Sequence, residues 1–198
     1  MKECGGVKTG SDGLRGATAL SHLFLREGVR EGNRVVDATC GNGHDTLLLA
    51  ELVGGGGKVW GFDIQESAIV ATSLLLESAG CRDQVELIHG GHEQLGSFVS
   101  GPVDAIVFNL GYLPGGDKSC VTHPRETLAA LARGAELLSP GGRICIALYT
   151  GHPGATEEAE AVDGWAAGLL PREFHVWRCR QMNRSPVAPY LILIEKGC

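Results

Sequence analysis

Residues 35–46 read VVDATCGNGHDT and join a β-rich segment to a helical one through a glycine-rich turn. Glycine has no side chain, so the backbone at Gly41 and Gly43 can approach a ligand closely. The helix that follows presents unpaired backbone N–H groups, which attract an anionic group such as a carboxylate. This strand, turn and helix predict a ligand site at the start of a doubly wound α/β domain.

Strand-like and helix-like segments alternate on either side of this stretch. The expected strands are residues 34–38, 58–64, 85–89, 103–109, 143–149, 173–180 and 189–195. The expected helices are residues 14–29, 46–53, 67–79, 125–138 and 156–169, with a turn at 139–142 before the fifth strand. The alternation predicts a parallel sheet with right-handed crossovers. The last two strands have no helix between them, so we expect them to pair antiparallel through a turn at 182–187.

The predicted fold class is therefore α/β and Rossmann-like, with a mostly parallel seven-stranded sheet and a C-terminal antiparallel hairpin. This order of elements resembles that of class I methyltransferases. The chain has 198 residues, which fits one domain, and we expect that domain to span residues 14–198. Residues 1–13 contain four glycines and no apolar periodicity. We expect them to form a flexible tail or the remainder of a trimmed targeting segment.

The composition is that of a soluble protein, with 43% hydrophobic and 20% charged residues. No apolar run reaches the length of a membrane span, and the N-terminus lacks the layout of a signal peptide. We therefore expect no membrane partner and a cytoplasmic location, or an organellar one in a plant or alga. The seven cysteines form no CxxC pair, which indicates neither a metal site nor a disulfide framework.

The formal net charge of −6 argues against a protein coated all over by nucleic acid. A local basic patch is still possible, because Arg172, Arg178, Arg180 and Arg184 fall within thirteen residues, with His175 among them. The simplest interpretation is a solvated outer strand. The patch becomes an RNA contact only if the catalytic motifs indicate a polyanionic substrate.

The glycine turn favours S-adenosyl-L-methionine over a dinucleotide cofactor. A dinucleotide fingerprint has Gly or Ala at its third small position, and Thr46 occupies that position here. Asp37 and Asp45 flank the turn with negative charge, which would repel a pyrophosphate but suits an amino group and a sulfonium. We expect these three residues to bind the methyl donor together with the turn itself, residues Cys40, Gly41, Asn42 and Gly43.

Two further positions extend this cofactor site. Asp63 ends the second expected strand, where a carboxylate can accept both ribose hydroxyls; its alternative role is to cap the next helix. Ile64 and Gln65 are expected to flank the adenine. His92 follows the third strand and is expected at the edge of the base, or else it is a histidine of a surface loop.

The segment Asn109–Lys118 directly follows the fourth expected strand, where open α/β sheets bind ligands. Its Asn-x-x-Tyr spacing parallels the Asn/Asp-Pro-Pro-Tyr motif of amino-group methyltransferases. By that parallel, the side-chain oxygen of Asn109 and the carbonyl of Leu110 accept the two N–H bonds of an amine. The ring of Tyr112 stacks on the target base. These residues predict methyl transfer to an amino nitrogen.

An alkylamine is mostly protonated at neutral pH, and the ammonium form must lose its proton before the nitrogen can attack. With an ordinary pKa of about 10.4, only about one molecule in a thousand is neutral at pH 7.4. Desolvation and the adjacent sulfonium both lower that pKa. Asp117, Tyr149 and His152 are the candidates for relaying the proton, and Asp117 can instead hold the ammonium or order its glycine loop.

Three runs together, residues 37–46, 108–119 and 151–154, resemble the YtqB-type family of rRNA methylases, and residues 62–65 match as well. The resemblance extends from about Leu20 to Lys196. It implies methylation of the 5-aminomethyl group of 2-thiouridine at the tRNA wobble position, with the anticodon region as partner. A homodimer is left open. The candidate RNA contacts are Tyr112, Lys118, Tyr149, Arg178, Arg180, Asn183 and Arg184.

Three other functions compete with this interpretation. A non-catalytic RNA-binding scaffold would lack the glycine turn, Asn109 or Tyr112, and the chain has all of them. An NAD-dependent oxidoreductase is disfavoured by Thr46 and by the acidic residues that flank the turn. An N-methyltransferase that acts on rRNA or on a small-molecule amine is the nearest alternative.

Overall fold

The computed structural model describes residues 15–111, 122–151 and 154–198. Four of the predicted site residues lie outside these ranges, namely Tyr112, Asp117, Lys118 and His152. The expected N-terminal tail, residues 1–13, lies outside them as well. No helix in the described ranges combines the length and the apolar character that a membrane crossing requires.

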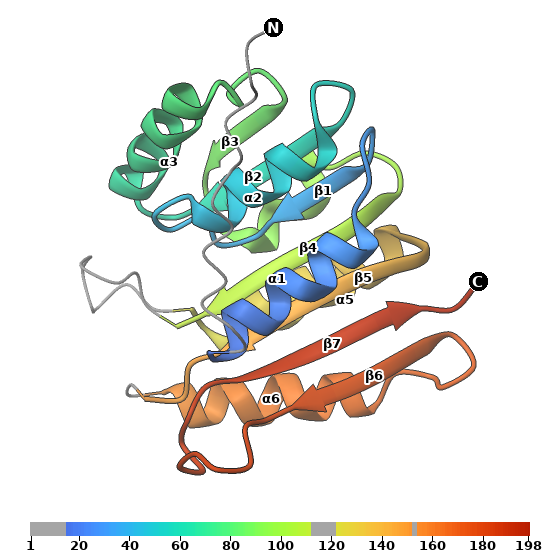
Figure 1. The fold of residues 1–198 in the computed structure, drawn as a ribbon. Helices are drawn as coiled ribbons and strands as arrows, with labels where there is room; N and C mark the ends of the chain where they lie inside the picture. The colour runs from blue at the N-terminus through green and yellow to red at the C-terminus, as the bar shows by residue number, and fades with distance from the viewer. Residues whose placement is uncertain (1–14, 112–121, 152–153) are drawn as a thin grey trace, which may run out of the picture.

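Seven strands form a single sheet in the order β3-β2-β1-β4-β5-β7-β6 (Figure 1). The strands are β1 (Arg34–Asp37), β2 (Lys58–Asp63), β3 (Val85–His89), β4 (Val103–Leu110), β5 (Leu138–Leu148), β6 (Phe174–Cys179) and β7 (Tyr190–Lys196). The first five are parallel, whereas β7 pairs antiparallel with both β5 and β6. The predicted fold class and the C-terminal hairpin are confirmed.

Helices cover both faces of the sheet. They are α1 (Ala17–Gly28), α2 (His44–Val53), α3 (Glu66–Ala79), α4 (Leu95–Phe98), α5 (Pro124–Leu137) and α6 (Ala155–Ala167), with a 3₁₀ turn η1 (His92–Gln94). In Figure 1, α1 and α2 lie in front of the sheet and α5 and α6 behind it. Neither η1 nor α4 was predicted, because elements of three and four residues are too short to show a helical period.

Two apolar cores lie on either side of the sheet because side chains alternate along each strand. On β4, Ile106 and Phe108 belong to the core that contains residues of α5 and α6. Ala105 and Val107 alternate with them along the strand and belong to the core that contains residues of α1, α2 and α3. Burial on both faces explains why β4 is a nearly continuous apolar run.

The turn predicted at residues 139–142 is instead part of β5, which begins at Leu138. Val103 pairs with Leu138 and Ala105 with Arg143, so the strand pairing shifts across the intervening residues. The sequence Pro140-Gly141-Gly142 has turn composition, and Gly141 has a φ of 74°, but this irregularity stays within the strand. The prediction of a separate turn was therefore wrong.

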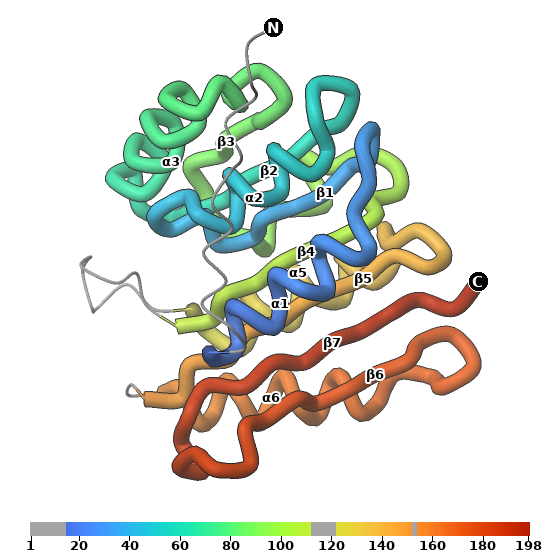
Figure 2. The backbone as a smooth tube through the Cα atoms, in the orientation of Figure 1, coloured from blue at the N-terminus to red at the C-terminus, as the bar shows by residue number. Residues whose placement is uncertain are grey.

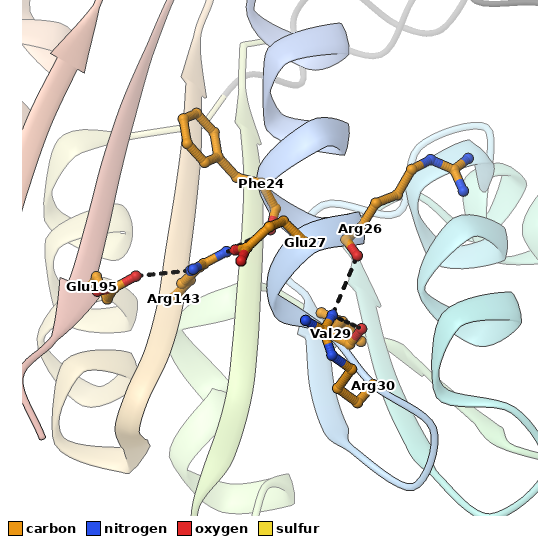
Figure 3. Close-up of polar contacts among 7 residues, drawn as sticks. All are labelled: Phe24, Arg26, Glu27, Val29, Arg30, Arg143 and Glu195. Carbon is orange, nitrogen blue, oxygen red and sulfur yellow. Dashed lines mark hydrogen bonds and ion pairs between the residues drawn. The ribbon is translucent and has the colours of Figure 1, made fainter.

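Helix α1 is fixed along the sheet by Arg143 of β5 (Figure 3). The guanidinium donates a hydrogen bond to the carbonyl of Phe24 at 3.0 Å and also pairs with the carboxylate of Glu27. Its Nε lies 3.0 Å from a carboxylate oxygen of Glu195 on β7. A single side chain thus joins α1 to two strands of the sheet.

The carboxyl ends of the parallel strands share one edge of the sheet, on the left in Figure 1. The chain path in Figure 2 brings the first turn of α1 to the same edge, beside the end of β5. The hydroxyl of Tyr149, just after β5, lies 2.6 Å from the hydroxyl of Thr18 on α1. Two residues that are 131 positions apart in the chain therefore meet at this edge.

Candidate active site

A cavity of about 550 Å³ lies at the carboxyl edge of the sheet. Its lining residues are Thr18 on α1, residues 38–42, 44 and 45 after β1, residues 63–65 after β2, residues 90–93 after β3, Asn109 and Gly111 at the end of β4, residues 122, 123 and 126 at the start of α5, and Tyr149 after β5. Ten predicted site residues are among them: Cys40, Gly41, Asn42, Asp45, Asp63, Ile64, Gln65, His92, Asn109 and Tyr149.

The glycine turn packs closely against α3. Gly41 and Gly43 both have positive φ, 53° and 82°, which side chains rarely tolerate. A Cβ on Gly43 would lie 2.9 Å from the Cα of Thr72, so the turn has no room for a side chain there. The Thr72 hydroxyl also donates to the carbonyl of Gly41 at 3.3 Å. Gly43 precedes α2 and fixes the direction in which its first turn points.

Asp63 connects β2 to the glycine turn. One carboxylate oxygen accepts a hydrogen bond from the backbone N–H of Gly41 at 2.9 Å, and the other accepts from the backbone N–H of Gln65 at 2.9 Å. A carboxylate has about four acceptor positions, so these two bonds leave room for ligand hydroxyls. Ribose binding by Asp63 stays a prediction, whereas its alternative role as the cap of the next helix is wrong, because Gln65 is the N-cap residue of α3. Ile64 beside it is half exposed.

Asp37 lies beneath the turn and is fully buried, so it is not among the lining residues. Its carboxylate accepts hydrogen bonds from the Thr46 hydroxyl at 2.6 Å and from the Thr39 backbone N–H at 3.1 Å. Burial, together with the nearby charge of Asp45, raises the pKa of Asp37 to about 7. Thr46 is buried as well. The sequence analysis grouped both residues with the ligand contacts, but the structure gives them contacts to the turn.

Cys40 and Leu110 are also buried. A Cβ on Gly61 of β2 would lie 2.7 Å from the Cys40 sulfur, so that glycine makes space for the cysteine. Burial raises the pKa of the Cys40 thiol well above its ordinary value, so the thiol stays protonated at neutral pH. The side chain of Leu110 lies in the core, which leaves only its backbone for the role predicted for it.

His92 begins η1 and is buried rather than part of an exposed loop. Its ring packs edge-on against Phe108 with centroids 5.7 Å apart, and its Nε2 lies 3.4 Å from the Thr127 hydroxyl. Burial lowers the pKa of His92, so a neutral imidazole lines the cavity. The alternative of a surface histidine is excluded.

Asn109, the second-to-last residue of β4, lines the cavity. Its amide nitrogen donates a hydrogen bond to an oxygen of Asp45 at 2.6 Å, and its backbone N–H donates to the Thr39 hydroxyl at 2.7 Å. Its amide oxygen is buried and has no hydrogen-bond partner within the described part of the chain. Asp45 is buried too, and its other oxygen lies 2.5 Å from Nε2 of His22 on α1.

The predicted RNA contacts near the C-terminus are exposed and do not line the cavity. Arg178 forms an ion pair with Asp163 of α6 at 2.9 Å. The guanidinium of Arg180 stacks 4.6 Å from the centre of the Tyr190 ring. Because β6 is antiparallel to β7, and β7 to β5, β6 ends at the same sheet edge as β5. Asn183 and Arg184 follow β6 and are exposed at this edge.

Several lining residues were not predicted from sequence, including Thr18, His44, Glu93, Thr122, His123 and Glu126. The hydroxyl of Thr122 donates at 2.6 Å to Glu158, a buried carboxylate of α6. His44 lies in the glycine-turn motif, and the others belong to no motif. Position at the end of a strand or the start of a helix was the signal available for them. The described residues contain no cluster of three or more potential metal ligands.

The chain is similar to proteins of known family. The profile of the family described as "Putative rRNA methylase" matches residues 59–195. A chloroplastic tRNA (mnm5s2U34)-methyltransferase of Arabidopsis thaliana is 40% identical over 93% of this chain and 70% of its own length.

Two solved structures have the same fold at substantial sequence identity. One, described as a "putative rRNA-methylase" from Clostridium thermocellum, is 42% identical, covers 93% of this chain and 99% of its own, and superposes with a TM-score of 0.90. The other, described as "a putative methyltransferase" from Streptococcus mutans, is in complex with S-adenosylhomocysteine. It is 36% identical, covers 92% of this chain and 98% of its own, and gives a TM-score of 0.84.

Proposed function

This chain belongs to the family described as "Putative rRNA methylase", and from that membership we propose that it methylates an amino nitrogen of tRNA. The chain is an S-adenosylmethionine-dependent methyltransferase, as its relatives and the S-adenosylhomocysteine complex indicate. The proposed reaction converts 5-aminomethyl-2-thiouridine to 5-methylaminomethyl-2-thiouridine at the wobble position, with the anticodon region bound. The tRNA activity of the Arabidopsis relative supports this choice of substrate.

The observation that carries the proposal is the unpaired amide oxygen of Asn109. A carboxylate only accepts hydrogen bonds, so Asp45 holds the amide nitrogen of Asn109 on its own side. Within the described residues, the amide oxygen is thereby left as an acceptor without a donor. A buried acceptor without a partner costs about 1–3 kcal/mol, and an amine N–H of a substrate would remove that cost. This arrangement suits a nucleophile that can donate a hydrogen bond to the amide oxygen, such as an amine.

The cavity residues fit the methyl donor. S-adenosyl-L-methionine, when bound, supplies an electrophilic methyl group on a sulfonium. We assign the glycine turn and the start of α2 to its carboxylate, and Asp63 to the ribose hydroxyls. Ile64, Gln65 and His92 are assigned to the adenine. Asp37 and Thr46 would act indirectly, since they hold the turn from beneath.

The chemistry is an in-line displacement, so correct placement of the amine is the main contribution of the protein. Asn109 and the backbone carbonyl of Leu110 would hold the two N–H bonds, and Tyr112 would stack on the base. Asp117, Tyr149 and His152 remain the proposed proton acceptors. Of these, Tyr149 lines the cavity and its hydroxyl contacts Thr18.

We assign RNA binding to the exposed segment from Arg178 to Arg184, together with Lys118. Arg184 and Asn183 are exposed at the sheet edge that holds the cavity. The loop that contains them is tied to the end of β5, because the Thr150 hydroxyl donates to the carbonyl of Val187 at 2.7 Å. A cytoplasmic or organellar location and a homodimer remain predictions; the Arabidopsis relative is named as chloroplastic.

A methylation assay tests the proposal. Purified protein is given S-adenosylmethionine with a tritiated methyl group and tRNA that carries 5-aminomethyl-2-thiouridine at the wobble position. We expect label in that nucleoside, identified by mass spectrometry. The matched control is the same tRNA with plain 2-thiouridine, which lacks the amine. Parallel reactions contain rRNA or small alkylamines. Label in rRNA or in a small amine, with none in the tRNA, would overturn the choice of substrate.

A further inference from the structure

We infer that His22 of α1 is a positioning residue for methyl transfer. His22 holds Asp45, and Asp45 in turn fixes which way the amide of Asn109 points. The inference rests on the proposed role of Asn109, and it gives a function to α1, a helix that lies outside every motif. Three elements are involved: α1, the first turn of α2, and the end of β4.

The three side chains form a continuous hydrogen-bonded chain. Nε2 of His22 lies 2.5 Å from Oδ1 of Asp45, and Oδ2 of Asp45 lies 2.6 Å from the amide nitrogen of Asn109. Because the carboxylate only accepts, Nε2 of His22 carries a hydrogen in this arrangement. Each oxygen of Asp45 therefore has one donor. Hydrogen bonds to a charged acceptor are short and roughly twice as strong as neutral ones.

The orientation of Asn109 depends on this carboxylate. The terminal amide torsion of asparagine is broad and roughly two-fold, so two orientations that differ by a flip are both sterically allowed. Only one of them points the NH₂ group at Asp45, and in it the buried amide oxygen has no partner among the described residues. If Asp45 moved, the flip would replace the acceptor by a donor. An amine substrate would then face N–H groups rather than an oxygen.

His22 is what keeps Asp45 in place from the other side. The side chain of Asp45 is only 6% exposed, so water has little access to it. A buried carboxylate oxygen without a donor is costly. Loss of the imidazole would leave Oδ1 in that state, and Asp45 would turn to satisfy it. The side chain of His22 is 29% exposed, so the histidine itself can be replaced without a large cavity.

Helix α1 is anchored so that His22 reaches the site. Thr18 and His22 are four residues apart and therefore lie on one face of the helix. The Thr18 hydroxyl contacts that of Tyr149, and both residues line the cavity. At the other end of the helix, Arg143 binds the carbonyl of Phe24 and the carboxylate of Glu27 (Figure 3). Both ends of α1 are thus tied to β5 or the residue after it.

The test compares three substitutions at His22. His22→Gln keeps an N–H donor at the position of Nε2, since both side chains reach it through the same number of bonds. His22→Asn is one bond shorter and cannot reach Asp45, and His22→Ala has no donor. Arg26→Ala, an exposed change on the same helix, is the control. The measurements are the single-turnover methylation rate at saturating cofactor and the Kd for S-adenosylhomocysteine by calorimetry.

We expect the Ala and Asn variants to lose at least about tenfold in rate, because misplaced reactants are costly, with Kd changed less than about threefold. The Gln variant should stay within about threefold of the parent rate, as should Arg26→Ala. A parent-like rate for His22→Ala overturns the inference. So does a Gln variant as slow as the Ala variant, or a Kd that weakens in step with the rate.

A second readout does not depend on activity. The side-chain NH₂ signals of Asn109 are assigned by nitrogen-15 NMR, from the signals lost in Asn109→Ala. They should move in His22→Ala and stay in place in Arg26→Ala. If the parent protein fails to methylate the tRNA, the proposed function fails while this readout still tests the link. Unmoved Asn109 signals in His22→Ala would overturn the link itself.

Discussion

The amide nitrogen of Asn109 lies 2.6 Å from a carboxylate oxygen of Asp45, and its own amide oxygen has no partner within the described residues. These two residues are 64 positions apart in the chain. Their contact joins the motif after β1 to the motif at the end of β4. The proposed cofactor and acceptor parts of the site are therefore linked by a direct hydrogen bond.

Asn109→Ala should leave cofactor affinity mostly intact while lowering turnover at least about a hundredfold, because the acceptor amine loses its placement. The measurements are the single-turnover rate and the Kd for S-adenosylhomocysteine. The parent protein serves as reference for both. A rate close to that of the parent protein would refute the assigned role of Asn109.

Asp63→Ala should act in the opposite way, on the cofactor rather than on the rate. The change removes a charged acceptor from the N–H groups of Gly41 and Gln65. Hydrogen bonds to charged groups contribute about 1.5–3 kcal/mol, which is roughly ten- to a hundredfold in Kd. Calorimetry measures this, with the exposed Asp83→Ala as control. Equal affinities for the two variants would contradict the prediction.

Asp37→Asn should change how stability depends on pH. The pKa of Asp37 is raised from 3.8 to about 7 in the folded protein, so the folded state holds the proton more tightly than the unfolded state. Stability is therefore highest below pH 4 as far as this group is concerned. It falls as the pH rises to about 7, by at most about 4 kcal/mol.

Asparagine has no proton to lose, so this decline should be absent in the variant. Urea unfolding at a series of pH values from 4.5 to 8, roughly the window in question, measures it for both proteins. The two curves of unfolding free energy should lie closest at pH 4.5, where Asp37 is protonated in the folded protein. They should separate toward pH 8, because only the parent protein loses stability. Parallel curves would mean that Asp37 titrates normally.

Gly43→Ala should destabilise the fold and weaken cofactor binding together. Gly43 has a φ of 82°, and an added Cβ would meet the Thr72 backbone at 2.9 Å. The left-handed conformation alone costs about 1–2 kcal/mol. Gly164→Ala is the matched control: it lies inside α6 with open space around it and should stabilise by roughly 0.5–1 kcal/mol. Thermal unfolding distinguishes the two, and a neutral Gly43→Ala would contradict the close packing.

Arg178 and Arg180 replaced together by Glu should weaken tRNA binding and flatten its dependence on salt. The expected loss is modest, because Arg178 is already paired with Asp163 and Arg180 stacks on Tyr190. Binding is measured by filter retention between about 50 and 200 mM salt. Arg133→Glu on α5 provides the control. Unchanged binding would return this segment to a solvated outer strand.

The sequence predicted the fold because its signals were local. Strand periodicity, the glycine turn and the missing helix before β7 were each visible within a dozen residues. The one clear error, at residues 139–142, has a physical cause. Pro140 and Gly141 have turn composition, but pairing of Leu138 with Val103 keeps the strand continuous on both sides of them. Tertiary pairing overrode the local preference.

The residues of the site that belong to motifs could be predicted from the sequence, whereas the residues that hold them in place could not. Gly41, Asp63 and Asn109 were found because each lies at or just after the end of a strand. His22 could not be found, since nothing near it in sequence resembles a site and its partner Asp45 is 23 residues away. The burial of Asp37 was equally invisible, because a carboxylate in a glycine motif looks like a ligand contact. Side-chain contacts between elements are set by packing, and a single sequence does not reveal them.

The lone acceptor at Asn109 also has a bearing on which target atoms the enzyme can tolerate. A nucleophile with an N–H group can donate a hydrogen bond to the amide oxygen of Asn109. An unprotonated aromatic ring nitrogen or an enolate carbon has no hydrogen-bond donor, so the oxygen would stay unpaired. At about 1–3 kcal/mol, that mismatch would disfavour such targets by roughly five- to 150-fold, before shape is considered. The proposed preference for an amine over other target atoms therefore depends on the orientation of the Asn109 amide, which its hydrogen bond to Asp45 fixes.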